Sequence, residues 1–408
     1  MEQEPINRRI QPPRRHFPWL FLSILVVAAL LIISIVIYKI DDAQRHAPVT
    51  TPVAKSTLSE GDTITIAAAG DINISQEILD SVKRPGYIYD FSDMLMSVAP
   101  LLSDADITVA DLEVNMIEDI YNGENCNAPE SLLTALAGAG VDILQTANTV
   151  SVFNGMSGLT STVYAVQNAG MTPVGTFPTQ DAFTKSGGYT LVEAKGFRIA
   201  FVAFTKGVGN LNLPEGSENC VNLLYKDYAT TYQTVDTAGI QAVLDNVAAA
   251  QPDITVALLH WGSEYDDSVS STQKKIRGLL LDNGVDVILG THSHMVGEVD
   301  TTTKDGTVVA YSLGNLLSSS AHGYNQGIVL KVTFAVKNGQ IVLASTDYEP
   351  IYIADAEETQ SGRMEVLNTN SVISLYESEY ITKVSKSIYE TLLTSRDKVA
   401  ALVAPEKD

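Results

Sequence analysis

Five apolar segments of this chain are each followed by a side chain that can bind a metal ion. The segments have the length and composition of buried strands: Thr63–Ala69, Ile107–Ala110, Val141–Ala147, Ile254–Leu259 and Val285–Leu289. The ligand-capable residues that follow them are Asp71, Glu113, Asn148, His260, His292 and His294. Asp and Asn are also common in turns, but ligands of open α/β sheets gather beyond the carboxyl ends of the strands. The pattern predicts sheets whose strand ends meet at one polar site.

Three of the six histidines belong to this set. His292 and His294 lie in Gly290-Thr291-His292-Ser293-His294, and His260 ends the preceding strand. Such residues can simply hydrogen-bond the loops above them, but together the imidazoles, carboxylates and amide suit two divalent ions of the Zn, Mn or Fe type. Two ions ~3.5–4 Å apart polarise a substrate oxygen and acidify a water molecule. The pattern therefore favours hydrolysis or group transfer, without identifying the bond.

Helical patterns alternate with the strands and predict an α/β fold with buried sheets covered by helices. The expected helices cover 91–102, 129–139, 158–169, 237–250 and 271–283. Two hairpins are expected, 189–194 with 197–204 and 327–336 with 340–345, together with a short strand at 172–174 and another at 308–312. Because hairpins are antiparallel, the sheets are expected to be mixed.

An uncharged apolar run from Phe17 to Tyr38 is long enough to span a bilayer as a helix. Four arginines precede it, which places the N-terminus in the cytoplasm by the positive-inside rule. We expect a cytoplasmic tail at 1–16, an uncleaved transmembrane signal anchor at 17–40 and a Thr/Ser/Ala/Pro-rich linker at 41–62. The chain would then be a single-pass protein of the cell membrane with its main domain outside.

The net charge limits which macromolecules the chain can bind. After residue 16 the chain carries 22 basic and 46 acidic residues, a formal net charge of −24. Such a domain repels nucleic acid and does not favour tight, non-specific capture of a polyanion.

Cys126 and Cys220 are the only cysteines. They either form a disulfide, which an exported compartment permits, or remain two unpaired thiols in loops.

The ordered motifs resemble the bacterial CapA family of capsule or poly-γ-glutamate synthesis proteins, which has a calcineurin-like metallophosphatase fold. The resemblance covers roughly residues 63–335. It is carried by Gly70-Asp71, Asp111-Leu112-Glu113, Ala147-Asn148, His260-Trp261-Gly262-Ser263-Glu264-Tyr265, Gly290-Thr291-His292-Ser293-His294 and Tyr311-Ser312-Leu313-Gly314-Asn315. It implies a four-layer α/β/β/α sandwich with mixed sheets, occupying about 63–350.

The resemblance also implies how the ligands divide between two ions. Asp71 and His294 would bind one ion, Glu113 would bridge, and Asn148, His260 and His292 would bind the other. Three further residues are expected to contact these ligands rather than the ions: Asp111, Asn73 and Asn315. The partners implied are a cell-envelope polymer or peptide-like substrate, the membrane and other capsule-synthesis membrane proteins.

The chain departs from the family pattern after Asn148. The family usually has Asn-Asn-His-x-x-Asp-x-Gly there, whereas this chain has Val150 in place of the histidine and Phe153 in place of the aspartate. In related metallophosphatases that histidine donates a proton to the leaving group. Valine cannot, and losing a general acid costs ~10²–10⁴-fold in rate. No catalytic side chain is therefore assigned.

Smaller candidates lie outside the ligand set. Glu264 and Tyr265 can orient substrate, or form a rim salt bridge and a packing ring. His322 lies in a predicted surface loop, with a substitute proton donor as the alternative. Residues 351–408 form an expected C-terminal extension, helical from about 372 to 403.

Two functions follow from these observations. The first is a membrane-anchored, extracellular CapA-like hydrolase or transferase with two divalent ions, acting on poly-γ-glutamate or another cell-envelope polymer, with activity reduced by the change at Val150. The alternative is a non-catalytic metal-binding scaffold or binding component in export or anchoring of the capsule polymer.

Overall fold

The computed structural model describes residues 58–86, 88–118, 121–301, 306–319, 324–379 and 384–405. These residues belong to one compact unit, Ala54–Asp408. In the part of the chain that the structure describes, no helix combines the length and apolar character needed to cross a membrane. The expected anchor at 17–40 lies outside the described residues, as does most of the expected linker. The last residues of that linker already contact the domain, because the Gly61 N–H donates to the Val336 carbonyl over 3.0 Å.

The first sheet combines parallel and antiparallel strands in the order β16-β15-β14-β1-β4-β5-β6, with β13 paired to β1. Its strands are β1 (Thr63–Ile72), β4 (Ile107–Leu112), β5 (Ile143–Gln145), β6 (Thr172–Val174), β13 (Asn315–Leu317), β14 (Gln326–Lys337), β15 (Gln340–Ala354) and β16 (Glu365–Asn368). The strands β1, β4, β5 and β6 are parallel, so their carboxyl ends lie at one edge. The antiparallel strands β14 to β16 extend the sheet on the other side of β1.

The second sheet has the order β11-β12-β10-β9-β8-β7. Its strands are β7 (Thr190–Ala194), β8 (Phe197–Thr205), β9 (Ile254–His260), β10 (Val287–Thr291), β11 (Val299–Asp300) and β12 (Val308–Ala310). The inner strands β8, β9, β10 and β12 run parallel, and antiparallel strands close both edges. The predicted mixed character of both sheets is confirmed.

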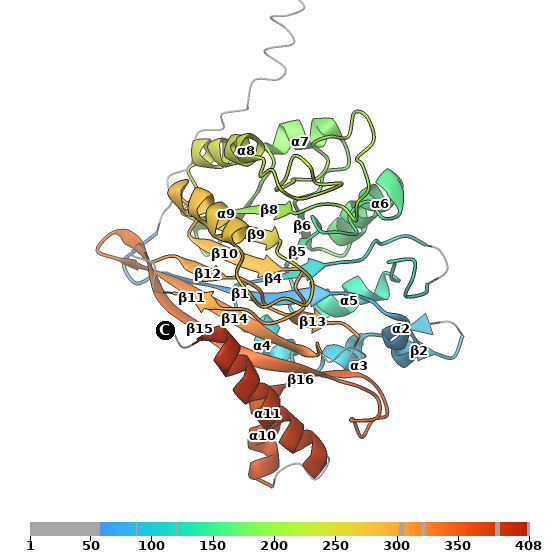
Figure 1. Ribbon diagram of the computed structural model, residues 1–408. Coiled ribbons are helices and arrows are strands. Elements are labelled where there is room, and N and C mark those ends of the chain that lie inside the picture. Colours follow the sequence, from blue (N-terminus) through green and yellow to red (C-terminus); the bar gives the residue numbers. More distant parts are fainter. Residues whose placement is uncertain are drawn as a thin grey trace, which may run out of the picture. The chain divides into compact units, whose positions relative to one another are not determined.

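Helices cover the outer faces of the two sheets. They are α2 (Gln76–Val82), α3 (Ser92–Leu95), α4 (Ala99–Ser103), α5 (Ser131–Gly138), α6 (Gly155–Asn168), α7 (Gln180–Ser186), α8 (Thr237–Ala250) and α9 (Ser271–Asp282). Figure 1 shows α8 above the second sheet, and α3 and α4 beneath β1 and β4 of the first. A small hairpin of β2 (Lys83–Arg84) and β3 (Ile88–Tyr89) follows α2.

Alternating side chains of the central strands divide the interior into three apolar layers. Ile64 and Ile66 of β1 face Phe201 of β8 in the layer between the sheets. Ala67, from the opposite face of β1, packs with the helices that cover the first sheet, and Val202 of β8 packs with those that cover the second. Because successive strand residues point to opposite faces, each sheet is buried on both sides. The predicted four-layer α/β/β/α sandwich is confirmed.

The C-terminal segment differs in detail from the expected helical extension. The expected boundary at 350/351 falls inside β15, and β16 adds a further strand to the first sheet. Two helices, α10 (Thr369–Glu377) and α11 (Lys386–Val403), replace the expected single one. They pack together on β15 and β16 around Leu367, Ile373 and Leu392.

Candidate metal centre

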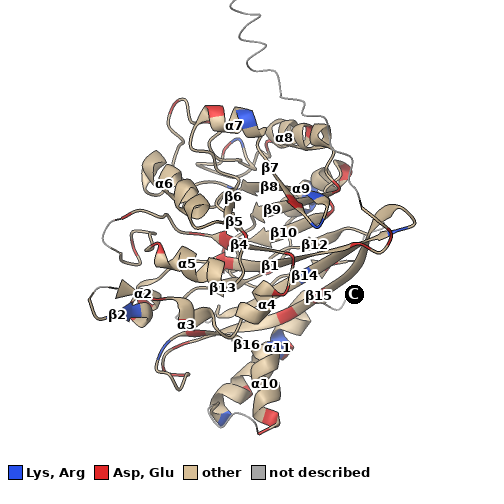
Figure 2. Ribbon diagram, turned by 180° about the vertical axis from the view of Figure 1, so that it is seen from behind, with Lys and Arg blue, Asp and Glu red and all other residues tan. Residues whose placement is uncertain are grey.

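The strand ends of the two sheets converge on one buried polar cluster. In the first sheet, the register pairs Asp71 of β1 with Asp111 of β4. In the second, it pairs Thr291 of β10 with His260 of β9. Hydrogen bonds join the two sheets within this cluster. The backbone N–H of His292, after β10, donates to both carboxylate oxygens of Asp71 in β1, at 3.2 and 3.1 Å. Figure 2 shows acidic positions in the interior of the fold at β4.

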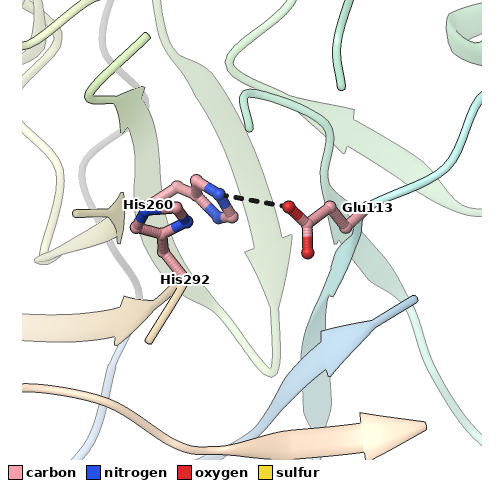
Figure 3. Close-up of side chains that lie close together, drawn as sticks. All are labelled: Glu113, His260 and His292. Carbon is pink, nitrogen blue, oxygen red and sulfur yellow. Dashed lines mark ion pairs between the residues drawn. The ribbon is translucent and has the colours of Figure 1, made fainter. Parts of the chain in front are cut away.

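Glu113, His260 and His292 form the first ligand group, and each offers an atom within 4.8 Å of the others. The His260 Nε2 lies 3.5 Å from the Glu113 Oε1, and the two imidazole rings are 4.5 Å apart between centroids. In Figure 3 the carboxylate of Glu113 faces the two rings from the opposite side of the site. This is a compact set of one oxygen and two nitrogen ligands.

Asp71, Glu113 and His294 form a second ligand group. The His294 Nδ1 lies 3.6 Å from the Asp71 Oδ2, and its Nε2 lies 3.8 Å from the Glu113 Oε2. Glu113 is therefore common to both groups and presents a different oxygen to each. This is the division that the family resemblance implies. Asp71, Asp111 and His260 also bring ligand atoms within 4.8 Å of one another, but Asp111 accepts hydrogen bonds from Asn148 and Thr291.

Unsatisfied buried atoms show that the residues fit metal ions. Nine buried polar atoms of the described side chains have no hydrogen-bond partner, and three of them lie in this cluster: the Glu113 Oε2, the His260 Nε2 and the His292 Nδ1. Leaving a buried polar atom unpaired costs about 1–3 kcal/mol. All three atoms belong to the proposed ligand groups, so a bound cation would satisfy each of them. The donor set of imidazoles and carboxylates matches Zn, Mn or Fe.

Asp111 and Asn315 hold the imidazoles in position. The His260 Nδ1 lies 2.7 Å from the Asp111 Oδ2, which also accepts from the Thr291 hydroxyl at 2.9 Å. The His294 Nδ1 lies 2.9 Å from the Asn315 Oδ1. A metal-binding histidine typically uses its second ring nitrogen in this way. The contact leaves the Nε2 of each ring directed at Glu113. Asn73 is half-buried and its backbone N–H donates to the Leu317 carbonyl, but among the described contacts none joins its side chain to a ligand.

Asn148 lies against the same cluster. Its Nδ2 donates to the Asp111 Oδ1 and to the Leu112 carbonyl, both at 2.8 Å. Its Oδ1 accepts from the Val150 N–H at 3.2 Å. A carbonyl oxygen has two lone pairs, so one remains for an ion. The neighbouring Thr149 hydroxyl donates to the Glu113 Oε1 over 2.6 Å.

The segment Gly290–His294, which carries two of the three histidines, has a strained backbone. His292 has a φ of +90° and His294 a φ of +58°, in a region that side-chain-bearing residues rarely adopt. Such strain persists where the surroundings determine the conformation, and it concentrates at functional sites. Gly290 is required at the loop's start, because a Cβ there would lie 2.0 Å from the Tyr311 carbonyl oxygen.

Burial and mutual charge shift the titration of the cluster. Burial raises the pKa of Asp71 to about 8, against the opposing charge of His294. Burial lowers the pKa of His260, but Asp111 and Glu113 outweigh it and raise the value to about 10. Burial, the charge on His260 and the charge on Lys206 hold the pKa of His292 well below its usual range. A neutral imidazole is the form that binds metal.

Glu264 and the two cysteines, which were also predicted as candidates, are not members of the ligand groups. Glu264 is exposed on the loop after His260. Cys126 and Cys220 are both free, so of the two alternatives the structure shows unpaired thiols rather than a disulfide. Cys220 is buried in the layer between the sheets. His322 lies outside the described residues.

Two side chains beside the site, those of Lys206 and Tyr324, were not among the residues predicted from the sequence. Lys206 follows β8, and its ammonium donates to the Gly262 carbonyl over 2.7 Å. Lys206 could have been predicted from its position, because it directly follows an apolar strand. Tyr324 stacks on Tyr265 with centroids 4.5 Å apart, and Tyr265 lies 5.7 Å from the His294 ring. The stacked pair therefore borders the second ligand group.

The fold is a two-sheet α/β sandwich, and the cluster at its strand ends offers two groups of side chains that could hold divalent metal ions. The family model for the bacterial capsule synthesis protein PGA_cap matches residues 65–320, and the chain belongs to this family. The capsule biosynthesis protein CapA of Bacillus anthracis is 25% identical over 304 residues, covering 72% of this chain and 68% of that protein. The PGA biosynthesis protein CapA of Bacillus subtilis is 24% identical over 308 residues, covering 71% and 72%.

Solved structures offer more distant similarities. The calcineurin-like phosphoesterase YfkN from Bacillus subtilis has a TM-score of 0.42 and 12% identity, covering 84% of this chain and 98% of that chain. A phosphatase from Mycoplasma pneumoniae has a TM-score of 0.41 and 13% identity, covering 72% and 94%. The family assignment rests on the family model and not on these structures.

Proposed function

We propose that this protein is a membrane-anchored, extracellular hydrolase or transferase that uses two divalent ions of the Mn, Zn or Fe type. The observation that carries the proposal is the pair of ligand groups that share Glu113. One ion would be held by Glu113, His260 and His292, with Asn148, and the other by Asp71, Glu113 and His294. When bound, such ions polarise a substrate oxygen and acidify a water nucleophile.

The protein's own residues give this site its shape. Asp111 and Asn315 fix the two imidazoles, and Thr149 fixes one oxygen of Glu113. The half-buried Val150 stands where the family usually has a proton-donating histidine, and its side chain has no proton to transfer. The leaving group would therefore depart without that acid, which is expected to slow turnover by about 10²–10⁴-fold.

The family suggests the substrate class. The relatives are named for biosynthesis of a capsule and of PGA, and we propose poly-γ-glutamate or another cell-envelope polymer as the substrate. Residues 17–40 would anchor the protein, with 1–16 in the cytoplasm and 41–62 as a spacer. Other capsule-synthesis membrane proteins would be partners, and the formal net charge of −22 disfavours nucleic acid.

A second function is favoured by the loop after Asn148. Val150 and Phe153 remove two polar side chains while the ligand set is kept. This combination also fits a non-catalytic, metal-binding component of polymer export or anchoring.

One experiment separates the two functions. The full chain would be purified in detergent and its metal content measured. Amide and phosphoester cleavage would then be assayed for the wild type and for His294→Ala. Turnover that His294→Ala abolishes supports the enzyme, whereas stoichiometric metal without turnover on any substrate supports the scaffold. A chain that binds no metal after reconstitution would contradict both.

A further inference from the structure

We propose that Lys206 is a specificity-determining residue that binds a carboxylate of the substrate beside the ion held by Glu113, His260 and His292. This inference rests on the proposed function, because it names the group that selects the substrate at that site. It concerns recognition of the substrate and not the chemical step.

The backbone places Lys206 next to a ligand. The β8–β9 register pairs Thr205 with His260, and the Lys206 N–H donates to the His260 carbonyl over 2.8 Å. The Lys206 Nζ donates to the Gly262 carbonyl, two residues beyond that ligand, over 2.7 Å. Main chain and side chain of Lys206 therefore contact the polypeptide on both sides of the His260–Gly262 turn. The ammonium is fixed at the same sheet edge as the ligand.

A tyrosine ring holds the ammonium from another side. The Lys206 Nζ lies 4.8 Å from the centroid of the Tyr232 ring, and the Tyr232 hydroxyl donates to the Asn210 Oδ1 over 2.9 Å. Close packing keeps this ring in place, because a Cβ on Gly207 would lie 2.4 Å from the Tyr228 carbonyl oxygen and 2.8 Å from the Tyr232 ring. Lys206 is thus positioned before a ligand arrives, which lowers the entropy cost of binding.

The ammonium retains capacity for an anion. It has three N–H donors, and the Gly262 carbonyl takes one. Within the described ranges, no carboxylate lies within the 4.0 Å of an ion pair with Lys206. Burial lowers the pKa of Lys206, while the charge of Glu264 opposes the shift. Because the side chain is half-buried, the cation has lost part of its hydration, which a bound anion would replace.

The size of the charge favours a carboxylate. A single half-buried ammonium is a point charge that matches a group of charge −1. Phosphate carries more charge and is commonly bound through several donors or a bidentate arginine. The chain as a whole has a formal net charge of −22, so an acidic polymer would be attracted at this point and repelled elsewhere. Lys206 would then select which residue of the polymer lies over the ions.

The test compares charge and position in the full chain, purified in detergent and loaded with Mn²⁺. The variants are Lys206→Met, which keeps the length of the side chain, and Lys206→Arg, which keeps its charge. Lys226→Met is the matched control, because Lys226 is 60% exposed and its Nζ lies 4.0 Å from an Asp236 oxygen. The probes are a γ-linked glutamate oligopeptide, its fully amidated counterpart and inorganic phosphate, with binding followed by calorimetry.

Lys206→Met should weaken binding of the carboxylate oligopeptide roughly 10- to 100-fold. Binding of the amidated oligopeptide and metal content should stay unchanged, Lys206→Arg should retain most of the affinity, and Lys226→Met should retain all of it. The proposal is overturned if both oligopeptides lose affinity equally, if metal is lost, if only phosphate binding falls, or if the wild type does not bind the carboxylate oligopeptide. Binding without turnover would contradict catalysis and leave the result for Lys206 standing.

Discussion

The sheet around β1 and β4 supplies the candidate metal centre with oxygen atoms, whereas the sheet around β9 and β10 supplies it with imidazole nitrogens. Asp71 lies near the end of β1, and Glu113 and Asn148 follow β4 and β5 of the first sheet, whereas His260, His292 and His294 end or follow strands of the second. Carboxylates alone favour Mg or Ca, and imidazoles shift the preference towards Zn, Mn or Fe. Neither sheet offers the complete donor set.

This difference makes the two sheets depend on each other electrostatically. Burial raises the pKa of Asp71 to about 8, because a buried carboxylate is costly. On the other side, Asp111 and Glu113 overcome burial and raise the pKa of His260 to about 10. Bound ions would replace these protons as the balancing positive charge. The ions should therefore stabilise the packing of one sheet on the other.

The largest effect is expected from Glu113→Gln, which alters the ligand common to both groups. Metal content should fall from two ions per chain to almost none. An ion present at 100 times its Kd stabilises a protein by about 2.7 kcal/mol, so the loss of two should cost about 5 kcal/mol. Elemental analysis and urea unfolding at fixed metal concentration would measure both. Glu264→Gln is the control, since Glu264 is exposed on the nearby loop. Retention of one tightly bound ion would show that Glu113 does not bridge.

His292→Ala and His294→Ala should each remove one ion and leave the other. The two imidazoles belong to different ligand groups, so each variant should bind one ion per chain and lose about 2.7 kcal/mol of stabilisation. The double variant should match Glu113→Gln in metal content. If either single variant binds no metal, the two groups are not independent sites.

Asp111→Ala and Asn315→Ala test the groups that position the imidazoles. Asp111 lies 2.7 Å from the His260 Nδ1, and Asn315 lies 2.9 Å from the His294 Nδ1. Loss of such a partner typically weakens metal affinity 10–100-fold. Each variant should weaken the ion on its own side, as measured by competition with a chelator. Equal weakening of both ions by either variant would argue for a general loss of structure.

The smallest effect is expected from Val150→His combined with Phe153→Asp. Phe153 is 47% exposed, so the change should cost little stability. A restored general acid should raise any weak turnover by about tenfold, below the full range because the new imidazole has no partner to orient it. Metal content should be unchanged. Turnover equal to that of the wild type would count against the missing acid as the cause of low activity.

Strong periodic signals in the sequence predicted the fold well. The helix expected at 237–250 is α8, and the strand expected at 172–174 is β6. The helix α7 escaped prediction because none of its residues is buried, so it has no apolar face to recognise. The helix expected over 91–102 is broken into α3 and α4, with Pro100 in the first turn of α4. Proline disfavours a helical conformation in the residue before it.

The sequence predicted the types of ligand and, through the family resemblance, Asp111 and Asn315 as residues that contact them, but it did not predict the two threonines that also contact the cluster. Residues directly after apolar strands are recognisable from position alone, which is why Asp71 and His260 could be proposed. Thr149 and Thr291 contact Glu113 and Asp111 across more than thirty residues of chain. Side-chain hydrogen bonds of this kind depend on how the sheets pack, and no local pattern encodes them.

The sequence by itself determined the central strands, the ligand-capable residues at their ends and the resemblance to the family, because these depend on local pattern and order along the chain. Only the tertiary structure decided that Glu113 presents one oxygen to each ligand group and that Lys206 stands beside His260. It also decided that Cys126 and Cys220 stay apart. The reason is geometric. These distances between side chains depend on how the two sheets pack against each other, and each sheet is assembled from strands far apart in the sequence.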